Sequence, residues 1–312
     1  MIVHRGLDDL QPLPGAVVTS GTFDGVHRGH QTILARLTEV AHASNGQSVL
    51  ITYWPHPRTV VSNDSQDLKL LTTLDEKIDL LDQAGVDQLV VIPFTRSFSQ
   101  LTSEEFIHQI LIGKIGTKKL VIGYDHRFGR DREGGFDYIQ AHQSEYGFGV
   151  EEIPRQDVEA VGVSSSKIRK ALDEGNIQTA NRFLGRPYSL TGTIVKGRQL
   201  GRTIGFPTAN MQVDDVSKLV PANGVYAVDV LYAGQALRGM LNIGFRPTVD
   251  SAIIAGQTIE TYIFDFEKDI YGEHLTLRFR EFLRPEQKFD GLTALVAQLK
   301  QDEESARAAL AH

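Results

Sequence analysis

The segment Gly21–His30 carries residue types that suit a triphosphate ligand. Its three glycines would let the backbone approach a ligand closely, and His27 and His30 are three residues apart, so at the start of a helix both can point along one face. The N-terminus of such a helix attracts anions through its free N–H groups and its dipole. A later segment, Ser164–Arg169, adds a lysine and an arginine at a second predicted helix start, with a serine at the N-cap. Together these residues could hold ATP and stabilise the charge that develops on a pyrophosphate leaving group.

A second group of glycines and oxygen-bearing side chains lies in the other half of the chain, where Gly192–Gly197 leads into Gly201–Asn210. Thr208 and Asn210 alternate, so in an extended segment both side chains face the same side. One oxygen from each would suit Mg²⁺, which binds few protein oxygens together with phosphates and water. Taken alone, this segment is also typical of a hairpin rich in glycine and proline, just as His-x-Gly-His also occurs in metal sites and tight turns. The patterns therefore need the context of the elements that carry them.

Alternating strands and helices are predicted for the first half. Short runs of Val, Ile and Leu bounded by turn residues predict buried strands at Ala16–Ser20, Val49–Trp54, Leu89–Pro93 and Leu120–Gly123. Amphipathic stretches between them predict helices at His30–Ala43, Leu74–Ala84, Ser103–Ile112 and Phe136–Tyr146. Thr102 and Glu105 fit a capping box in front of the third helix. This alternation predicts a mostly parallel sheet with helices on both faces, and the glycine-rich and charged segments follow its strands, where ligands of such sheets bind.

From about Gly185 the pattern changes to strands separated by Gly, Pro and Asn. The predicted strands are Leu190–Lys196, Val225–Tyr232, Ala236–Ile243, Ile259–Phe266 and His274–Phe282, with no helix of useful length between them. We therefore expect an antiparallel sheet or small closed barrel, followed by helical segments at Gly291–Lys300 and Glu303–Ala311. The domain boundary is placed between residues 184 and 185, which gives an α/β domain of residues 1–184 and a mainly-β domain of residues 185–312.

The composition is that of a globular protein, with 41% hydrophobic and 23% charged residues among 312. The absence of cysteine excludes disulfides, thiolate metal sites and thiol nucleophiles. The net charge of -7 argues against a surface for nucleic acid, which needs concentrated Lys and Arg. No apolar run is long enough to cross a membrane, and Met1–Leu10 lacks the apolar centre of a signal peptide. We therefore expect a cytoplasmic protein, as a monomer or a weak homo-oligomer.

Two motifs of the first half resemble those of a known enzyme superfamily. Gly21–His30 resembles the (G/T)-x-F-D-G-x-H-x-G-H signature of nucleotidyltransferases, and Ser164–Arg169 resembles their I-S-S-T-x-I-R motif, with Ser166 in the threonine position. With Tyr53–Arg58 and Gly123–Gly129 included, the half is similar to the FMN adenylyltransferase module of prokaryotic bifunctional riboflavin kinase/FAD synthetases. The resemblance implies a Rossmann-like nucleotidyltransferase fold.

The same resemblance implies roles for individual residues. His27 and His30 would contact the ATP phosphates, and Arg169 would assist the departure of pyrophosphate. Asp24 and Gly25 would lie close to the reacting groups and to ATP. Further ATP contacts are expected at Gly21, Phe23, Gly123, Ser164, Ser165 and Lys167. Flavin contacts are expected at Trp54, Pro55, Phe94, Phe98, Asp125 and Phe128, although aromatic residues at such positions are at least as often part of a core.

The second half resembles another family. Gly201–Asn210 is closely similar to the G-R-x-x-G-F-P-T-A-N motif of riboflavin kinases, and Asn223–Tyr226, Asn242–Thr248 and Asp269–Gly272 follow in that family's order. The resemblance implies a six-stranded barrel with ATP and flavin sites at one end. Tyr262 departs from the family, in which a histidine is common at that position.

Roles in the second half follow from this resemblance. Thr208 and Asn210 would serve Mg²⁺ and the ATP phosphates. Glu260 would accept the proton of the ribityl 5′-hydroxyl as this hydroxyl attacks the γ-phosphate. Arg284 would approach the flavin. Further ATP contacts are expected at Gly192, Lys196, Gly201, Gly205 and Pro207.

The sequence as a whole predicts an enzyme that converts riboflavin and ATP to FMN and then FMN and ATP to FAD, with Mg²⁺ as cofactor. Two alternatives stay open. An enzyme that adenylylates nicotinate mononucleotide or a pantetheine phosphate would explain the first half but leave the second unexplained. A flavin or nucleotide sensor would bind such ligands without turnover, although the retained His27, His30, Arg169, Thr208 and Glu260 argue against a loss of catalysis.

Overall fold

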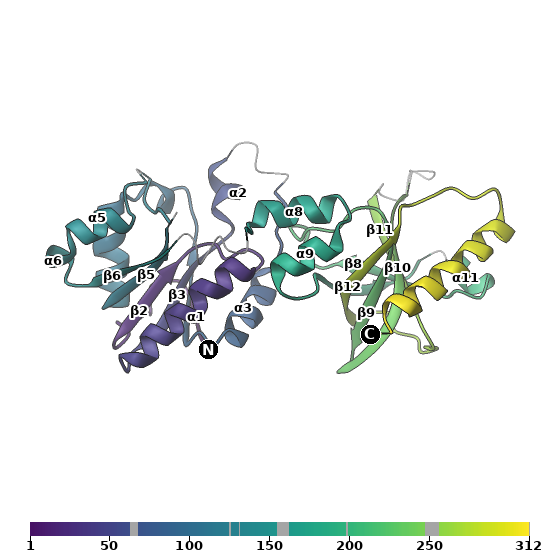
Figure 1. Cartoon of the computed structure of the whole chain (residues 1–312), viewed down its shortest axis with the longest axis horizontal. Coiled ribbons are helices and arrows are strands. Elements are labelled where there is room, and N and C mark those ends of the chain that lie inside the picture. Colours follow the sequence, from purple (N-terminus) through teal and green to yellow (C-terminus); the bar gives the residue numbers. More distant parts are fainter. Residues whose placement is uncertain are drawn as a thin grey trace. The chain divides into compact units, whose positions relative to one another are not determined.

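The computed structural model describes residues 1–62, 68–124, 126–130, 132–154, 162–197, 199–246 and 256–311. The chain divides into two compact units, Met1–Ser165 and Ser166–His312, which are described one at a time (Figure 1). The first is an α/β unit with a parallel sheet, and the second is a closed antiparallel barrel with a C-terminal helix. The predicted fold class is thereby confirmed. The sequence predicts the boundary between the adenylyltransferase and kinase domains after residue 184, whereas the two compact units meet at Ser165 and Ser166. The predicted domain boundary stays a prediction.

All six strands of the first unit are parallel, in the order β1-β4-β3-β2-β5-β6. They are β1 Ile2–Arg5, β2 Ala16–Ser20, β3 Gln47–Trp54, β4 Gln88–Pro93, β5 Lys119–Gly123 and β6 Gly149–Ile153. The four inner strands are the four that the sequence predicts. The outer strands β1 and β6 escape prediction because edge strands are less covered, and their sequences IVHR and GVEEI mix apolar with charged or polar residues.

Helices cover both faces of this sheet (Figure 1). They are α1 Arg28–Ala43, α2 Pro57–Val61, α3 Leu74–Gln83, the short 3₁₀ turn η2 Phe98–Gln100, α4 Ser103–Phe106, the π-helix η3 Ile107–Ile115, α5 Phe136–Ala141 and α6 Gln143–Tyr146. Leu34 and Leu37 of α1 belong to the same core as Val17 of β2, whereas Ile107 of η3 belongs to the other core with Val18. Because consecutive strand residues point to opposite faces, each strand contributes to both cores.

Capping boxes define two of the helix starts. The Thr102 hydroxyl accepts the Glu105 N–H at 3.1 Å while the Glu105 carboxylate accepts the Thr102 N–H at 2.8 Å, as the sequence predicts. Thr73 and Glu76 form the same arrangement at α3. Each box satisfies two backbone donors that a helix start would otherwise leave without partners.

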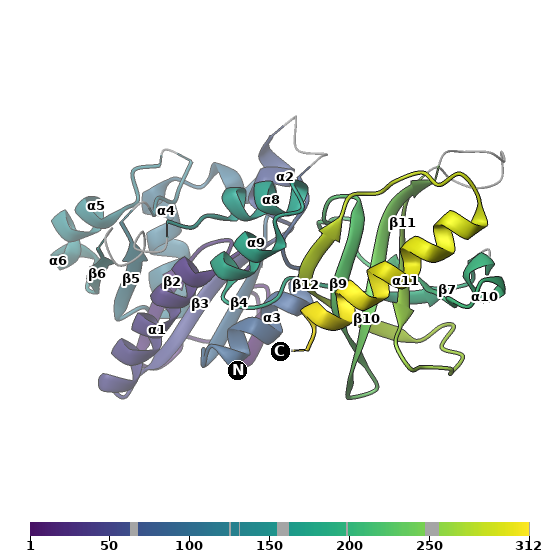
Figure 2. The same ribbon diagram turned by 45° about the vertical axis from the view of Figure 1, so that its right-hand side comes forward.

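Six antiparallel strands close the barrel of the second unit, in the order β10-β11-β8-β7-β12-β9. They are β7 Ser189–Val195, β8 Ala209–Val213, β9 Gly224–Tyr232, β10 Gln235–Arg246, β11 Gly256–Ile263 and β12 His274–Arg284. The helices are α8 Ser165–Asp173, α9 Ile177–Leu184, α10 Leu200–Thr203 and α11 Leu292–Ala309. Figure 2 shows the yellow α11 running across the outside of the barrel, where Ala306 packs with Ala227 of β9 and Met240 of β10.

The structure corrects three predictions about this unit. The two predicted C-terminal helical segments form one continuous helix, because Asp302 at the predicted break is 3% exposed and paired with Arg284. Strand β8, with the mixed sequence ANMQV, covers a segment that the sequence predicts only as extended, and it pairs with β7 and β11 on its two sides. Strand β11 begins and ends earlier than predicted, so Glu260 lies well inside the strand instead of near its start.

Candidate active sites

The loop between β2 and α1 brings His27 and His30 together at the N-terminus of a helix. His27 is the N-cap residue of α1, and its Nδ1 accepts the His30 N–H at 3.3 Å. The two imidazole rings stack with their centroids 3.6 Å apart, and the centroid of the Phe23 ring lies 4.8 Å from that of His30. Because the first N–H groups of a helix have no partner within it and the dipole is positive at this end, the pair lies where an anion binds favourably.

Buried hydrogen bonds hold the backbone of this loop. The Asp24 side chain is 2% exposed and accepts the N–H groups of two consecutive residues before α3, at 3.0 and 3.2 Å. The Thr72 hydroxyl accepts the Gly25 N–H at 3.1 Å. Phe23 and Val26 have positive φ angles of 46° and 37°, a conformation that is costly for residues with a side chain. The Asp24 carboxylate thus shapes the loop, and its predicted contact with ATP stays a prediction.

The first residue of α8, Ser165, contacts the same loop. The Ser165 hydroxyl donates a hydrogen bond to the Asp24 carbonyl oxygen at 3.0 Å, and Ser164 directly precedes it. Lys167 and Arg169 follow on α8, within the second unit, on either side of the fully buried Ile168. Their approach to ATP stays a prediction.

Aromatic side chains gather beyond the ends of β3 and β4. Phe94 and Phe98 pack against each other and against Tyr53, with ring centroids 5.6 to 5.9 Å apart. Phe106 links this group to Phe128, its ring centroid lying 6.3 Å from that of Phe98 and 5.0 Å from that of Phe128. Burial raises the pKa of Tyr53 to about 12. Three predicted flavin contacts therefore lie in one aromatic cluster, and most of this cluster belongs to the core on that face.

Trp54 lies on the other face of the sheet. It packs against the core under α1 and α3, and the centroid of its ring lies 5.6 Å from the Nζ of Lys77. The exposed Pro55 follows it, and Gly123 ends β5. Asp125 lies outside the described residues. The structure therefore separates Trp54 from the other predicted aromatic contacts, and all the flavin assignments stay predictions.

In the barrel, Thr208, Asn210 and Glu260 lie together where β8 pairs with β11. Asn210 and Glu260 are register partners, and the Thr208 hydroxyl donates a long hydrogen bond of 3.5 Å to Glu260 Oε2. A hydroxyl, an amide and a carboxylate at one place form an oxygen-rich set that suits Mg²⁺ beside phosphates and water. Because β11 is flanked by β10 and β8, Glu260 is not a residue of an exposed sheet edge.

Part of the glycine-rich segment lies directly against this polar trio. A Cβ added at Gly197 would stand 2.4 Å from the Asn210 amide nitrogen, and one at Gly201 would stand 2.1 Å from the Phe206 carbonyl oxygen. Both distances are shorter than real Cβ contacts. Gly197 can therefore lie against Asn210, and Gly201 against the Phe206 carbonyl, only because neither position carries a side chain.

The remaining predicted ATP contacts of this half are spread around the trio. Gly192 lies in β7 against the backbone of β8, so the barrel itself requires a residue without a side chain there. The Lys196 Nζ lies 5.8 Å from the centroid of the Tyr271 ring. Gly205 has a positive φ of 84° and stands two residues before Pro207, which lines a cavity.

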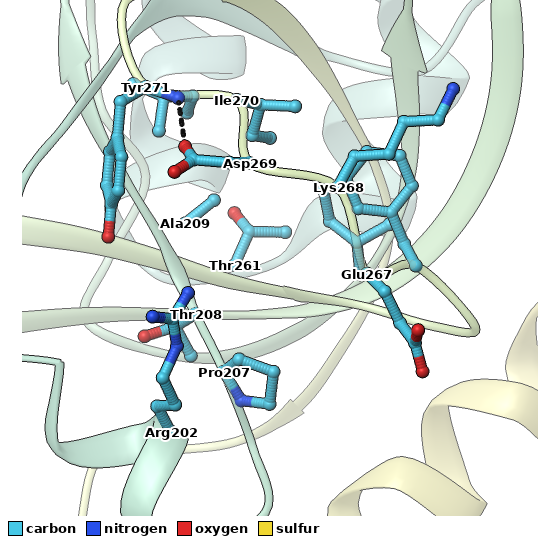
Figure 3. A pocket seen from close by; sticks show the side chains of 13 residues that line it. Arg202, Pro207, Thr208, Ala209, Thr261, Glu267, Lys268, Asp269, Ile270 and Tyr271 are labelled. Atoms are coloured by element: carbon cyan, nitrogen blue, oxygen red, sulfur yellow. Dashed lines mark hydrogen bonds between the residues drawn. The ribbon is translucent and has the colours of Figure 1, made fainter.

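This cavity has a volume of about 230 Å³ and opens beside Thr208 (Figure 3). It is lined by Ile194, Arg202, Pro207, Thr208, Ala209, Thr261, Ile263, Phe266, Glu267, Lys268, Asp269, Ile270 and Tyr271. The Thr261 side chain is 1% exposed, and its hydroxyl has no hydrogen-bond partner among the described residues. A buried hydroxyl is normally hydrogen-bonded, so the wall of this cavity offers a bond that a ligand could complete.

Arg284 is engaged by the C-terminal helix. Its Nε and Nη2 donate to the two carboxylate oxygens of Asp302 at 2.8 and 2.7 Å. A bidentate pair of this kind fixes both partners, and here it fastens α11 to the end of β12. The observed contact favours a structural role, and the predicted approach of Arg284 to the flavin stays a prediction.

Across the described ranges, no cluster of three or more His, Asp or Glu side chains could by itself hold a metal ion. The set formed by Thr208, Asn210 and Glu260 contains a single carboxylate, so phosphate oxygens would have to complete the coordination of a cation there. In the same ranges, no helix has the length and apolar character needed to span a membrane.

Known protein families match both halves of the chain. The family model of FAD synthetase matches residues 10–167, and that of riboflavin kinase matches residues 184–310. The first match contains the loop with His27 and His30, and the second contains the trio in the barrel.

Curated relatives extend this similarity over nearly the full length. A bifunctional riboflavin kinase/FMN adenylyltransferase from Escherichia coli strain K12 is 39% identical over 312 residues, covering 98% of this chain and 97% of the relative. A protein of the same name from Listeria monocytogenes is 38% identical over 294 residues, covering 94% and 91%. The crystal structure of a macrolide-efflux protein from Streptococcus pneumoniae is similar with a TM-score of 0.89 and 32% identity, covering 98% of this chain and 99% of that one.

Proposed function

The chain belongs to the family of bifunctional riboflavin kinases/FMN adenylyltransferases, and we propose which of its residues carry each of the two reactions. It is an enzyme of FAD biosynthesis that phosphorylates riboflavin to FMN and adenylylates FMN to FAD. The observation that carries this conclusion is the presence of both family matches, in this order, in one chain. An adenylyltransferase for another mononucleotide would have no use for the kinase half.

We assign FMN adenylylation to the loop between β2 and α1. The ATP phosphates lie at the N-terminus of α1 against His27 and His30, and the FMN phosphate attacks the α-phosphorus directly. Pyrophosphate leaves with its negative charge stabilised by the two imidazoles. Arg169, which lies in the second unit, is proposed to assist this departure on the family resemblance alone. The stacking of both histidines at a helix N-terminus supports this assignment. The step needs positioned reactants and no protein nucleophile.

We assign riboflavin phosphorylation to the trio in the barrel. Glu260 accepts the proton of the ribityl 5′-hydroxyl as the hydroxyl oxygen attacks the γ-phosphorus of ATP, and ADP leaves. Thr208 and Asn210 direct their oxygen and amide groups to the phosphates from the neighbouring strand. Kinases and nucleotidyltransferases commonly use a divalent metal, and Mg²⁺ held by Thr208 and Asn210 would neutralise phosphate charge when bound. The register pairing of Asn210 with Glu260 supports this assignment.

The cavity beside Thr208 is proposed to receive part of the ATP used by the kinase. Its volume of about 230 Å³ falls below the roughly 300 to 1,000 Å³ of pockets that enclose a whole drug-sized ligand, so only a portion of a nucleotide fits. Apolar walls from Ile194, Ile263 and Ile270 suit a planar base, and the Thr261 hydroxyl supplies one polar contact.

Replacing Thr261 with valine should weaken ATP binding in the kinase reaction about fivefold, the effect of losing one hydrogen bond worth ~1 kcal/mol. The ligand-free protein should become no less stable, because the variant removes a buried hydroxyl that has no described partner. The measurements are the KM for ATP in riboflavin phosphorylation and the unfolding temperature. Thr191→Val is the matched control, since Thr191 lies outside the cavity and is hydrogen-bonded to Thr276 at 3.0 Å. An unchanged KM for the Thr261 variant would contradict this placement of ATP.

We also propose that the enzyme works in the cytoplasm, since both reactions consume ATP. Its ligands are then ATP, riboflavin, FMN and FAD, and the sequence argues against nucleic acid as a partner because the net charge is -7.

Incubation of the purified chain with riboflavin, ATP and Mg²⁺, followed by chromatography of the flavins over time, tests both activities together. We expect FMN to appear first and then to give way to FAD. Accumulation of FMN without FAD would contradict the assignment of the first half. Absence of any conversion, with FMN also failing as a substrate, would contradict both assignments and favour a sensor.

A further inference from the structure

Lys77 is a buried lysine that neither reaction, as assigned above, uses. It lies in α3, one residue after the capping box, and its side chain is 2% exposed. A lysine is almost never buried this completely unless its charge has partners. The partners of the Lys77 ammonium group therefore indicate why a charged residue is buried at this position.

The ammonium group of Lys77 is directed at the loop between β2 and α1. Its Nζ donates a hydrogen bond to the Thr22 carbonyl oxygen at 2.8 Å, and the Thr52 hydroxyl donates to the same oxygen at 3.3 Å. The ring centroid of Trp54 lies 5.6 Å from this Nζ. Lys77 thus joins three segments of the first unit, namely α3, the end of β3 and the loop.

The hydrogen bond from Lys77 orients the peptide group between Thr22 and Phe23. In a planar trans peptide the N–H points opposite to the C=O, so holding the Thr22 carbonyl toward α3 turns the Phe23 N–H away from it. That N–H has no hydrogen-bond partner among the described residues. Phe23 is 3% exposed as a whole residue, and its ring lies against His30 with the ring centroids 4.8 Å apart, so the conformation of this peptide bears directly on the position of His30.

Burial of Lys77 disfavours the charged form of its ammonium group. Burial lowers the pKa of Lys77 from its ordinary value of 10.5 to about 8, and the Asp24 carboxylate opposes that shift. On its own helix, Glu76 is engaged in the capping box, while β3 contributes the Trp54 ring and the Thr52 hydroxyl. A buried charge adds little to stability compared with an apolar side chain of the same size, so stability alone does not account for a lysine here.

We propose that Lys77 is a positioning residue of FMN adenylylation, which holds the Thr22 carbonyl and thereby fixes the loop in the conformation that receives the ATP phosphates. The inference rests on the assignment of this loop to ATP. Lys77 itself touches no substrate and acts through the loop backbone. It also fixes the Trp54 ring at the end of β3, where the chain turns toward α2.

Lys77→Met in the full-length chain tests the proposal. The kcat/KM of FMN adenylylation for ATP should fall about 10- to 100-fold, as expected when reacting groups are misplaced by a fraction of an ångström to about 1 Å. Riboflavin phosphorylation by the same preparation should stay unchanged, and the unfolding temperature should not fall. Lys118→Met is the matched control, because Lys118 is an exposed lysine of the same unit.

The pH profile separates positioning from a purely structural role. Lys77 loses its proton as the pH rises through about 8, so adenylylation by the unaltered chain should decline there, and the Met variant should lack this decline. Stability should move the other way. Between pH 8 and 10.5 the unfolded chain binds more protons at this lysine than the folded chain, so stability rises with pH across that window.

Each outcome decides the inference. If Lys77→Met keeps full adenylylation while His30→Ala loses it, the loop binds ATP and the role given to Lys77 is wrong. If both variants keep full adenylylation, the assignment of the loop to ATP is wrong, and the inference falls with it. If activity and unfolding temperature fall together and the alkaline decline persists in the variant, Lys77 is structural and the proposal is overturned.

Discussion

Replacing His30 with alanine should lower the rate of FAD formation from FMN by about 10²- to 10³-fold, while riboflavin is still phosphorylated to FMN. This is the usual loss when one group that stabilises transition-state charge is removed from a site that excludes water. His30 stacks on His27 with ring centroids 3.6 Å apart, so the substitution removes one donor and leaves the other without its stacking partner. Both rates are measured on one preparation, with FMN or riboflavin as the flavin substrate.

A second histidine of the same helix provides the control. His42 lies in the last turn of α1 with a side chain that is 61% exposed, and it pairs with Asp87 at 3.3 Å. His42→Ala should leave both rates unchanged. A loss of both activities in His30→Ala would mean that His30 supports the fold, through its contact with Phe23 for example. Normal FAD formation would place the phosphate site elsewhere.

Local patterns predict the fold well where burial is complete. The four inner strands of the sheet are continuous apolar runs because both of their faces are covered, and each was predictable to within two residues of its observed start. The edge strands β1 and β6 and the short β8 mix apolar with polar residues and carry no such run, and their pairing depends on neighbours that are distant in sequence. The continuity of α11 likewise depends on a residue outside the helix, because Arg284 of β12 pairs with Asp302. The hydrophobic periodicity of the helix sequence cannot show this contact.

Some residues of the candidate sites can be found from sequence motifs, and others only from the packing of the fold. Motifs identify His27, His30, Thr208 and Asn210, since their spacing within one segment is itself the signal. Lys77 gives no such signal, because in the segment LDEKIDLLDQ it is one charged residue among several of an amphipathic helix. Only the packing of α3 against the loop shows that this lysine is buried. The Thr261 hydroxyl, which has no hydrogen-bond partner in the part of the chain that the structure describes, gives no signal in the sequence either, because its burial depends on the closed barrel.

A residue that a sequence resemblance assigns to a ligand can make a structural contact in the fold. Arg284 was a candidate for the flavin, yet its guanidinium is taken up by the buried Asp302. The same holds for Asp24, whose carboxylate accepts backbone N–H groups and so determines the shape of the loop. In both cases the observed contact is structural, and the predicted contact with a ligand stays a prediction.

Replacing Glu260 with glutamine should lower riboflavin phosphorylation by about 10²- to 10⁴-fold, the range for loss of a general base, while FMN is still adenylylated at its normal rate. Glutamine has nearly the same size and can still accept the hydrogen bond from Thr208, so strand pairing with Asn210 is retained. It cannot take the proton of the attacking hydroxyl. We therefore expect kcat to fall and the KM for ATP to stay within a few-fold, measured from initial rates of FMN formation.

Glu273→Gln is the control for this variant, because Glu273 is an exposed glutamate of the same unit, just before β12. It should leave both activities unchanged. Formation of FMN at the normal rate by Glu260→Gln would show that the hydroxyl loses its proton without Glu260, and the role of base would have to pass to another group or to water. A large rise in the KM for ATP with little change in kcat would instead assign Glu260 to holding the phosphates together with Thr208 and Asn210.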